Sequence, residues 1–324
     1  LAKVAAKHGG HYASHIRNEG VGVLEAIEEA LKIGREAGLP VHVSHLKASG
    51  QKAWGMSGDI VSVIEAARKK GQAVTADQYP YTASSTSLRA TLIPAQYREG
   101  TEQDYQSRLA DPKDGPRIRK AVEQALEERK GGQSIRVASY SKRKEWNGKD
   151  LEAIASAEKK SAADIVLEIE KNGGAQIVNF GMSEEDVRLI MKQPWVATAS
   201  DGAAQARTDS VPHPRSYGCF PRKVGRCALE DGIITPEHAI RSASGLPADI
   251  LRLPERGYLK SGYFADVVVF DPEKFRDQAT YDKPHQYATG VRYLFVNGQA
   301  AISEGKATDA LAGRVLRHKS KEER

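Results

Sequence analysis

Short apolar segments alternate with longer helical patterns over the first 80 residues, and this alternation restricts the fold more than any other feature. The sequence predicts strands at residues 11–15, 40–45 and 73–77, separated by helices over about 21–37 and 58–70. Glycines follow both helices, at Gly38 and Gly71. Strands that alternate with helices through short links are typical of right-handed βαβ units, so we expect a parallel sheet.

The rest of the chain continues this pattern and then changes. Further strands are predicted at 134–138, 175–180 and 195–200, and helices at 162–171, 183–191, 223–230 and 236–244. We count five strands of the βα type, whereas a closed barrel needs eight, so the sheet is either open or lacks its first strands. From about Gly257, a strand at 262–271 and a hairpin around Asn297-Gly298 predict a small β appendage.

Composition excludes several classes of protein. The chain has 324 residues, of which 40% are hydrophobic, enough for a sizeable core. Its net charge of +6 comes from basic residues spread among acidic ones, so we predict no nucleic-acid partner. No segment reaches the roughly 20 apolar residues that cross a bilayer, and we predict no membrane partner.

The cysteines and the first residues bear on localisation. Cys219 and Cys227 make neither a disulfide framework nor a zinc knuckle, and reduced thiols fit a cytoplasmic protein. The chain begins at Leu1 inside an apparent helix, which we interpret as a start within a domain. The sequence therefore leaves open a signal peptide upstream.

A short motif occurs twice, as Ser14-His15-Ile16-Arg17 and as Ser44-His45-Leu46-Lys47. Each copy ends a predicted strand, and parallel strands present such ends on one rim of the sheet. A single histidine there is usually a hydrogen-bonded core residue, but two in matching positions favour a shared site for Zn²⁺. His42 has the opposite strand parity to His45, so we expect it to face the surrounding helices.

Asp201 ends another predicted strand on the same rim and is followed by Gly202. A carboxylate there can contact the metal and accept a proton from an attacking water, although an aspartate at a strand end often only caps the next segment. Arg215 offers a planar fork suited to a carboxylate. Further hydrogen-bond donors for the same group are Lys47, Tyr79 and Ser85.

Each of the four candidate carboxylate-binding residues could instead have a purely structural role, such as a surface ion pair for Arg215 or packing for Tyr79. The chain has no Gly-rich phosphate loop and no Gly-x-Ser-x-Gly sequence. These two absences argue against nucleotide chemistry and against an α/β-hydrolase.

Several ordered segments carry a resemblance to a known family. They are Tyr12-Ala13-Ser14-His15-Ile16-Arg17-Asn18-Glu19-Gly20, Val43-Ser44-His45-Leu46-Lys47, Asp77-Gln78-Tyr79-Pro80-Tyr81-Thr82-Ala83-Ser84-Ser85-Thr86, Ser200-Asp201-Gly202, His213-Pro214-Arg215-Ser216-Tyr217-Gly218, Gly262-Tyr263-Phe264-Ala265-Asp266 and Ala312-Gly313-Arg314-Val315-Leu316-Arg317. In this order they resemble the N-acyl-D-amino-acid deacylase (D-aminoacylase) family of the amidohydrolase superfamily. The resemblance spans nearly the whole chain.

The resemblance implies an α/β fold, a (β/α)8 TIM barrel present here through its C-terminal strands, with a small β-sandwich. Residues 1–256 would belong to the barrel, with a helical insertion over the active site at about 86–160, and residues 257–324 to the sandwich. The implied reaction is zinc-dependent hydrolysis of N-acyl-D-amino acids, which are small-molecule substrates, to a D-amino acid and a carboxylic acid.

The same resemblance implies roles for individual residues. His15 and His45 would bind Zn²⁺ together with a cysteine, and Asp201 would be the catalytic acid and base. The substrate α-carboxylate would be held by Lys47, Tyr79, Ser85 and Arg215. The family's His-x-His motif and its metal-binding cysteine lie upstream of the segment matched by Leu1, and neither Cys219 nor Cys227 replaces that cysteine.

Two other hypotheses remain at this point: a cyclic-amide hydrolase similar to dihydropyrimidinase, and an inactive truncated half-barrel. The first has no evident use for a carboxylate site, and the second would leave strand edges uncovered. The sequence does not define the preferred side chain or acyl group, the number of metal ions or the oligomeric state.

Overall fold

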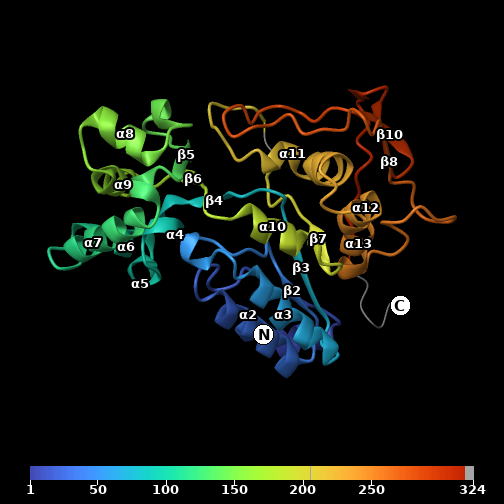
Figure 1. The fold of residues 1–324 in the computed structure, drawn as a ribbon, viewed down its shortest axis with the longest axis horizontal. Coiled ribbons are helices and arrows are strands. Elements are labelled where there is room, and N and C mark those ends of the chain that lie inside the picture. The colour runs from blue at the N-terminus through green and yellow to red at the C-terminus, as the bar shows by residue number, and fades with distance from the viewer. Residues whose placement is uncertain (205, 318–324) are drawn as a thin grey trace.

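A computed structural model describes residues 1–204 and 206–317 (Figure 1). A parallel sheet lies at the centre of the fold, with its strands in the order β1-β2-β3-β7. Its strands are β1 (Tyr12–Ser14), β2 (Val41–Val43), β3 (Val74–Gln78) and β7 (Val196–Thr198). The α/β architecture with a parallel sheet that the sequence predicts is confirmed.

Helices cover one face of this sheet. They are α2 (Val23–Ala37), α3 (Ser57–Lys69) and α10 (Glu184–Met191). Gly38 ends α2 with a left-handed φ of 68°, and the Ser183 hydroxyl accepts the Asp186 N–H at the start of α10. Val41 and Val43 of β2 lie in one hydrophobic cluster with buried residues of α2 and α3. Alternation along β2 therefore turns His42 to the opposite face.

The expectation that His42 faces the helices is wrong. Its ring contacts Thr75 and Asp77, which alternate with the helix-facing residues of β3. The alternation of side-chain direction along β2 does not continue from His42 to His45, because β2 ends at Val43 and His45 has a left-handed φ of 40°. The backbone turn brings both histidines to the same side of the sheet.

A second sheet is antiparallel, with the order β4-β6-β5. Its strands are β4 (Ser84–Ser87), β5 (Ile135–Ser139) and β6 (Gln176–Asn179). The prediction that 175–180 forms a βα-type strand of the parallel sheet is wrong, because β6 pairs antiparallel with both β4 and β5. An apolar run specifies a buried strand but not its partners.

Helices pack around this second sheet and share a hydrophobic cluster with it. They are α4 (Leu88–Leu92), α5 (Ala95–Arg98), α6 (Glu102–Ala110), α7 (Asp114–Glu127), α8 (Leu151–Glu158) and α9 (Ala162–Lys171). The short 3-10 helices are η1 (Gln51–Ala53), η2 (Lys130–Gly132) and η3 (Lys144–Trp146), and α1 (Ala2–Lys7) begins the chain. In Figure 1 this unit lies to one side of the parallel sheet, and the C-terminal region lies to the other.

The last third contains helices and a third sheet. The helices are α11 (Arg215–Pro221), a π-helix η4 (Arg222–Glu230), α12 (Pro236–Ala243) and α13 (Gly245–Leu251). The antiparallel sheet contains β8 (Val267–Phe270), β9 (Val291–Val296), β10 (Gln299–Ser303) and β11 (Lys306–Ala307). The predicted hairpin is confirmed, because β9 and β10 join through Asn297 and Gly298, both with positive φ.

A long connection between β8 and β9 crosses back to the second sheet, as Figure 1 shows along the top of the molecule. Arg136 of β5 donates to the Tyr281 carbonyl at 3.1 Å and pairs with Asp282 at 2.6 Å. Arg222 at the start of η4 pairs with Asp277 at 3.0 Å. These contacts join three parts of the fold around the strand ends. Within the described ranges, no helix is long and apolar enough to cross a membrane.

Candidate active site

Two histidine rings face each other at the carboxyl ends of neighbouring strands. His15 follows β1 and His45 follows β2, and their ring centroids lie 4.4 Å apart. The His15 Nδ1 atom is in direct contact with the His45 Nε2 atom. The two nitrogens therefore point at one position, as the ligands of a common metal ion do.

The chemistry of this pair fits a borderline metal such as zinc, which binds neutral imidazole nitrogens. Structural and catalytic zinc sites use three or four protein ligands. In the described part of the chain, no group of three or more His, Cys, Asp or Glu side chains is arranged to hold an ion. The two histidines by themselves would supply at most two members of such a ligand set. Cys219 is buried and donates its thiol hydrogen to the Ala199 carbonyl.

Asp77, which the sequence analysis did not select, fixes the backbone of His45. One Asp77 oxygen accepts the His45 N–H at 2.7 Å, and the other contacts His42 Nε2 at 2.7 Å. Burial raises the pKa of the Asp77 carboxyl, but the hydrogen bonds from His42 and His45 outweigh it and hold that pKa below its usual value. Non-glycine residues with positive φ are uncommon, and Asp77 stabilises this one at His45.

Glu19 is the second functional candidate that the sequence analysis missed. Its Oε1 atom lies 2.6 Å from the Lys47 ammonium and 2.9 Å from His45 Nδ1. Lys47 is 4% exposed, so a buried cation meets a carboxylate here. Burial raises the pKa of Glu19, but the His45 hydrogen bond and the Lys47 charge outweigh it and lower that pKa to about 2. The carboxylate is therefore ionised at neutral pH.

Arg215, at the start of α11, brings the predicted substrate-binding residues together. Its guanidinium lies 4.6 Å from the centre of the Tyr79 ring, and the Lys47 ammonium lies 5.8 Å from the same ring. The Arg215 Nη2 atom donates to the Ser85 carbonyl at 3.3 Å. The Nη1 atom lies 2.8 Å from Asp201 Oδ2, an ion pair at the end of β7. Asp201 has a left-handed φ of 47°.

Within this group, the buried Tyr79 Oη atom has no hydrogen-bond partner among the described residues, whereas Arg215 Nη1 is paired with Asp201. Burial raises the pKa of the Tyr79 phenol, so it remains protonated and able to donate. An unpaired buried donor is costly, and a ligand oxygen would satisfy the Tyr79 phenol. The Arg215 guanidinium and the Lys47 ammonium lie close to the Tyr79 ring, and this group of donors is suited to binding a carboxylate.

His213 positions Arg215. Its Nδ1 atom accepts the Arg215 N–H at 2.9 Å, and its Nε2 atom donates to the Ala83 carbonyl at 2.9 Å. The ring is 2% exposed and packs edge-on against Tyr81. Burial, and then the charge of Arg215, lower the pKa of His213 to about 3. The imidazole is neutral and holds the start of α11 in place.

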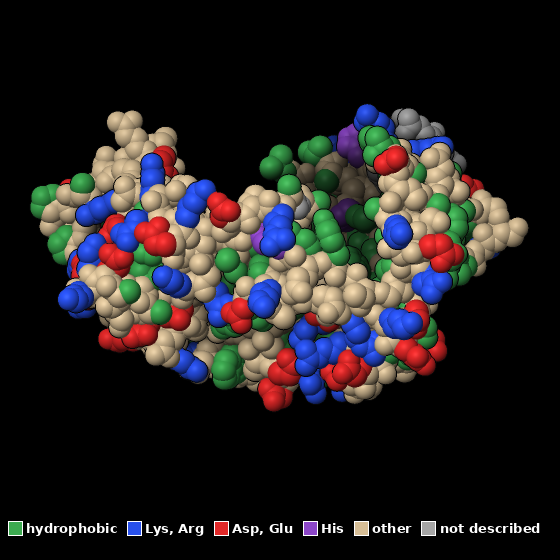
Figure 2. All heavy atoms as spheres, turned by 90° about the horizontal axis from the view of Figure 1, so that it is seen from above, with side chains coloured by type: hydrophobic (Ala, Val, Ile, Leu, Met, Phe, Trp, Pro, Cys, Tyr) green, Lys and Arg blue, Asp and Glu red, His purple; other side chains and the backbone are tan. Residues whose placement is uncertain are grey.

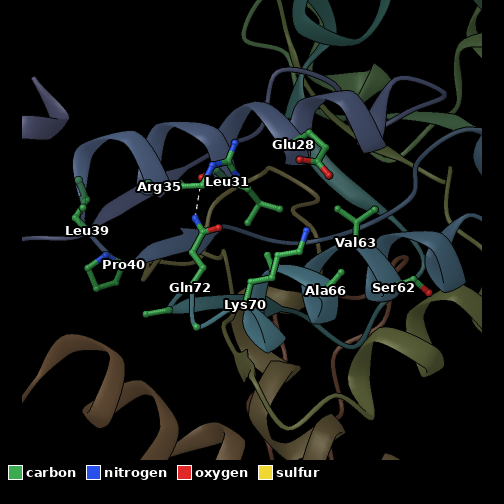
Figure 3. Close-up of a pocket in the computed structure, with 15 residues that line it drawn as sticks. Glu28, Leu31, Arg35, Leu39, Pro40, Ser62, Val63, Ala66, Lys70 and Gln72 are labelled. Carbon is green, nitrogen blue, oxygen red and sulfur yellow. Dashed lines mark hydrogen bonds between the residues drawn. The ribbon is translucent and has the colours of Figure 1, made fainter.

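The face of the molecule in Figure 2 is hollowed, with hydrophobic and histidine side chains inside the hollow. A separate cavity of about 680 Å³ lies between α2 and α3, at the opposite end of the strands (Figure 3). Gln72 crosses it to donate to the Leu31 carbonyl at 2.7 Å. The charged side chains around it, which include Arg35 and Lys70, are exposed. The described residues that line it include none of the predicted site residues.

A parallel sheet with histidine, carboxylate and cationic side chains gathered at its strand ends is the arrangement of an α/β enzyme that carries its site at the carboxyl ends of the strands. The chain belongs to the amidohydrolase family, whose family model matches residues 1–302. It is 36% identical over 316 residues to D-aminoacylase from Alcaligenes xylosoxydans xylosoxydans. That alignment covers 98% of this chain and 56% of that enzyme.

Solved structures agree with this assignment. A crystal structure of D-aminoacylase superposes with a TM-score of 0.79 at 34% identity, covering 98% of this chain and 58% of that one. N-acyl-D-glutamate deacylase from Bordetella bronchiseptica superposes with a TM-score of 0.75 at 31% identity, covering 97% and 58%. The latter was crystallised with zinc and a phosphonate inhibitor that mimics the tetrahedral intermediate. The chain thus spans somewhat more than half the length of these relatives.

Proposed function

We propose that the protein hydrolyses the acyl amide bond of N-acyl-D-amino acids with the help of Zn²⁺. Two relatives support this substrate class by their names, D-aminoacylase and N-acyl-D-glutamate deacylase, which both refer to the D configuration. The observation that carries the proposal is the buried group of Arg215, Lys47 and Tyr79 beside Asp201. This group is suited to an α-carboxylate.

The covalent structure of the substrate relates the carboxylate site to the chemistry. The scissile amide nitrogen is bonded to the same carbon that bears the carboxylate. An α-carboxylate held by Arg215 and Lys47 therefore brings that amide next to Asp201, which lies 2.8 Å from Arg215. Fixing the carboxylate also limits which face of the α-carbon turns toward Asp201, and this is how the site would select one enantiomer.

Asp201 acts as general base and then as general acid. Its carboxylate removes a proton from the attacking water and returns that proton to the leaving amine. His15 and His45 would hold the metal, which would supply Lewis-acid polarisation of the acyl carbonyl and a more acidic water. The Ser85 carbonyl keeps Arg215 in place, and Tyr79 donates its phenol hydrogen to the substrate carboxylate.

Substrate analogues test the carboxylate site. The protein is supplied with Zn²⁺ and assayed on N-acetyl-D-amino acids, on their α-carboxamides, on the L enantiomers and on hydantoins. We expect turnover of the D acids and a large loss with the carboxamides, since these lack the charge that Arg215 binds. Faster turnover of hydantoins than of the D acids would replace the proposal with a cyclic-amide hydrolase.

Asp201→Asn tests the proton transfer. We expect turnover to fall at least 100-fold, because a general base usually contributes about that much to the rate. The zinc content should stay equal to that of the wild-type protein. Asp209→Asn is the matched control. Asp209 lies in the same loop, and its ion pair in the described part of the chain is with the exposed Lys144. Substantial activity in Asp201→Asn would refute the role of Asp201.

A further inference from the structure

Glu19, Lys47 and His45 form a triangle of close contacts at the rim. The Glu19 Oε1 atom contacts Lys47 Nζ at 2.6 Å and His45 Nδ1 at 2.9 Å, and Lys47 Nζ lies 2.7 Å from His45 Nδ1. One carboxylate oxygen thus meets both a candidate metal ligand and a candidate substrate-binding cation. No other described side chain contacts both groups in this way.

Two hydrogen bonds to backbone groups hold the loop that carries Glu19 in place. The Asn18 side chain accepts the Gly20 N–H at 2.8 Å, and the Glu19 carbonyl accepts the Ser49 N–H at 2.7 Å. The second bond ties the segment after β1 to the segment after β2. Glu19 is therefore fixed relative to Lys47, which lies two residues before Ser49.

The hydrogens in this triangle can be assigned from the donors available. Lys47 has only hydrogens to donate, and the Glu19 carboxylate has only lone pairs to accept. Lys47 Nζ, 2.7 Å from His45 Nδ1, could donate to that nitrogen only in the Nε2–H tautomer, which would leave His45 without a lone pair toward His15. If Nε2 is to present a lone pair, the ring hydrogen must be on Nδ1, and Glu19 is then the acceptor within reach. A histidine that binds metal through one nitrogen commonly donates the other N–H to a carboxylate.

We propose that Glu19 is a positioning residue that holds His45 in the Nδ1–H tautomer and fixes Lys47 beside it. Glu19 thereby links the metal ligand to the substrate-binding lysine. The part that concerns Lys47 rests on the proposed function, whereas the part that concerns His45 depends only on the contacts above. Loss of the carboxylate would release both side chains at once.

The first measurement is the tautomer of His45 in the metal-free protein, read from long-range nitrogen–proton NMR correlations of the imidazole rings. We expect the Nδ1–H form in the unchanged protein and a shift toward the Nε2–H form in Glu19→Gln and Glu19→Ala. Glu29→Gln is the matched control, because Glu29 pairs with Arg17 at the exposed surface near the same loop. An unchanged His45 tautomer in both Glu19 variants would overturn the proposal.

The second measurement is the Zn²⁺ dissociation constant, obtained by competition with a chromophoric chelator. Loss of such a partner usually weakens metal binding 10- to 100-fold, and we expect about that change in Glu19→Gln with little change in Glu29→Gln. A dissociation constant within twofold of the unchanged protein would contradict the proposal, even if thermal stability fell. Glu19→Gln keeps the shape of the side chain, so it provides a folded variant should Glu19→Ala not fold.

The third measurement separates this proposal from the proposed function. For an N-acetyl-D-amino acid at saturating Zn²⁺, we expect Glu19→Gln to raise KM by more than it lowers kcat, because Lys47 binds the carboxylate. If the unchanged protein hydrolyses none of these substrates while Glu19→Gln still weakens zinc binding, the substrate assignment fails and the positioning of His45 stands. A fall in kcat with unchanged KM would overturn the part that concerns Lys47.

Discussion

Lys223 of η4 provides a quantitative test of how this fold accommodates a buried charge. Its side chain is fully buried, and its Nζ atom has no hydrogen-bond partner in the described part of the chain. Burial lowers the pKa of Lys223 from 10.5 to about 8, and the neighbouring thiols of Cys219 and Cys227 only partly oppose this. At roughly 1.4 kcal/mol per pH unit, the difference costs about 3 kcal/mol of stability at neutral pH.

Replacing Lys223 with methionine keeps the length of the side chain and removes the charge. We expect Lys223→Met to stabilise the fold by about 3 kcal/mol at pH 7, since the desolvation cost disappears. Between pH 8 and 10.5 the unfolded chain binds more protons than the folded protein, so the stability of the unchanged protein rises with pH. The advantage of the variant should therefore shrink through this window and vanish near pH 10.5.

Urea unfolding followed by circular dichroism at pH 7, 8, 9 and 10 measures this difference, and other titrating groups cancel between the two proteins. Lys69→Met is the control, because Lys69 is exposed at the end of α3 and its replacement should give no pH-dependent gain. The reasoning is refuted if Lys223→Met is less stable than the unchanged protein at pH 7. It is also refuted if the gain does not change between pH 8 and 10.

Two further predictions concern His213 and the glycines. The pKa of His213 lies near 3 in the folded protein and near 6.5 in the unfolded chain, so the free energy of unfolding should fall as the pH drops below 6.5, by about 2 kcal/mol at pH 5. His213→Asn should flatten that part of the pH profile in urea unfolding. An unchanged profile would contradict the neutral, buried state of His213. In Gly225→Ala the added Cβ would lie 1.9 Å from the Phe275 carbonyl oxygen, so we expect a loss of about 3 kcal/mol or more in thermal unfolding. In Gly58→Ala the added Cβ, on α3, meets no atom within 4 Å beyond the helix's own nearby backbone, so this change should instead gain about 0.5–1 kcal/mol. Equal effects of the two changes would show that space around the Cβ does not decide the outcome.

The regular elements of this fold follow closely from local sequence signals. Helix α9 begins after a capping box at Ser161 and spans Ala162–Lys171, as its pattern predicts. By contrast, β4 consists of serine and threonine residues without an apolar pattern and was not predicted. It forms because its backbone pairs with β6, a contact about 90 residues away in the chain. Partners at that distance are not encoded in local periodicity.

The site shows the same division between local and non-local information. Repetition of the Ser-His motif predicted that His15 and His45 come together, and the structure places their rings in contact. Glu19 and Asp77 were missed because their roles depend on contacts with His45 across separate strand ends. The left-handed backbone of His45 also made strand parity misleading for His42. A side chain's direction after a strand depends on the turn, which spacing does not specify.

The positive φ angles of His45 and Asp201 have a consequence for how this protein would respond to selection. Left-handed conformations cost non-glycine residues about 1–3 kcal/mol each, and glycine escapes that cost. A library screened only for heat resistance should therefore enrich glycine at these two positions. The selected variants would be more stable and would lack the side chain of His45 or Asp201, each of which has a role in the proposed chemistry. Thermostability screens of this protein thus need a parallel selection for hydrolysis.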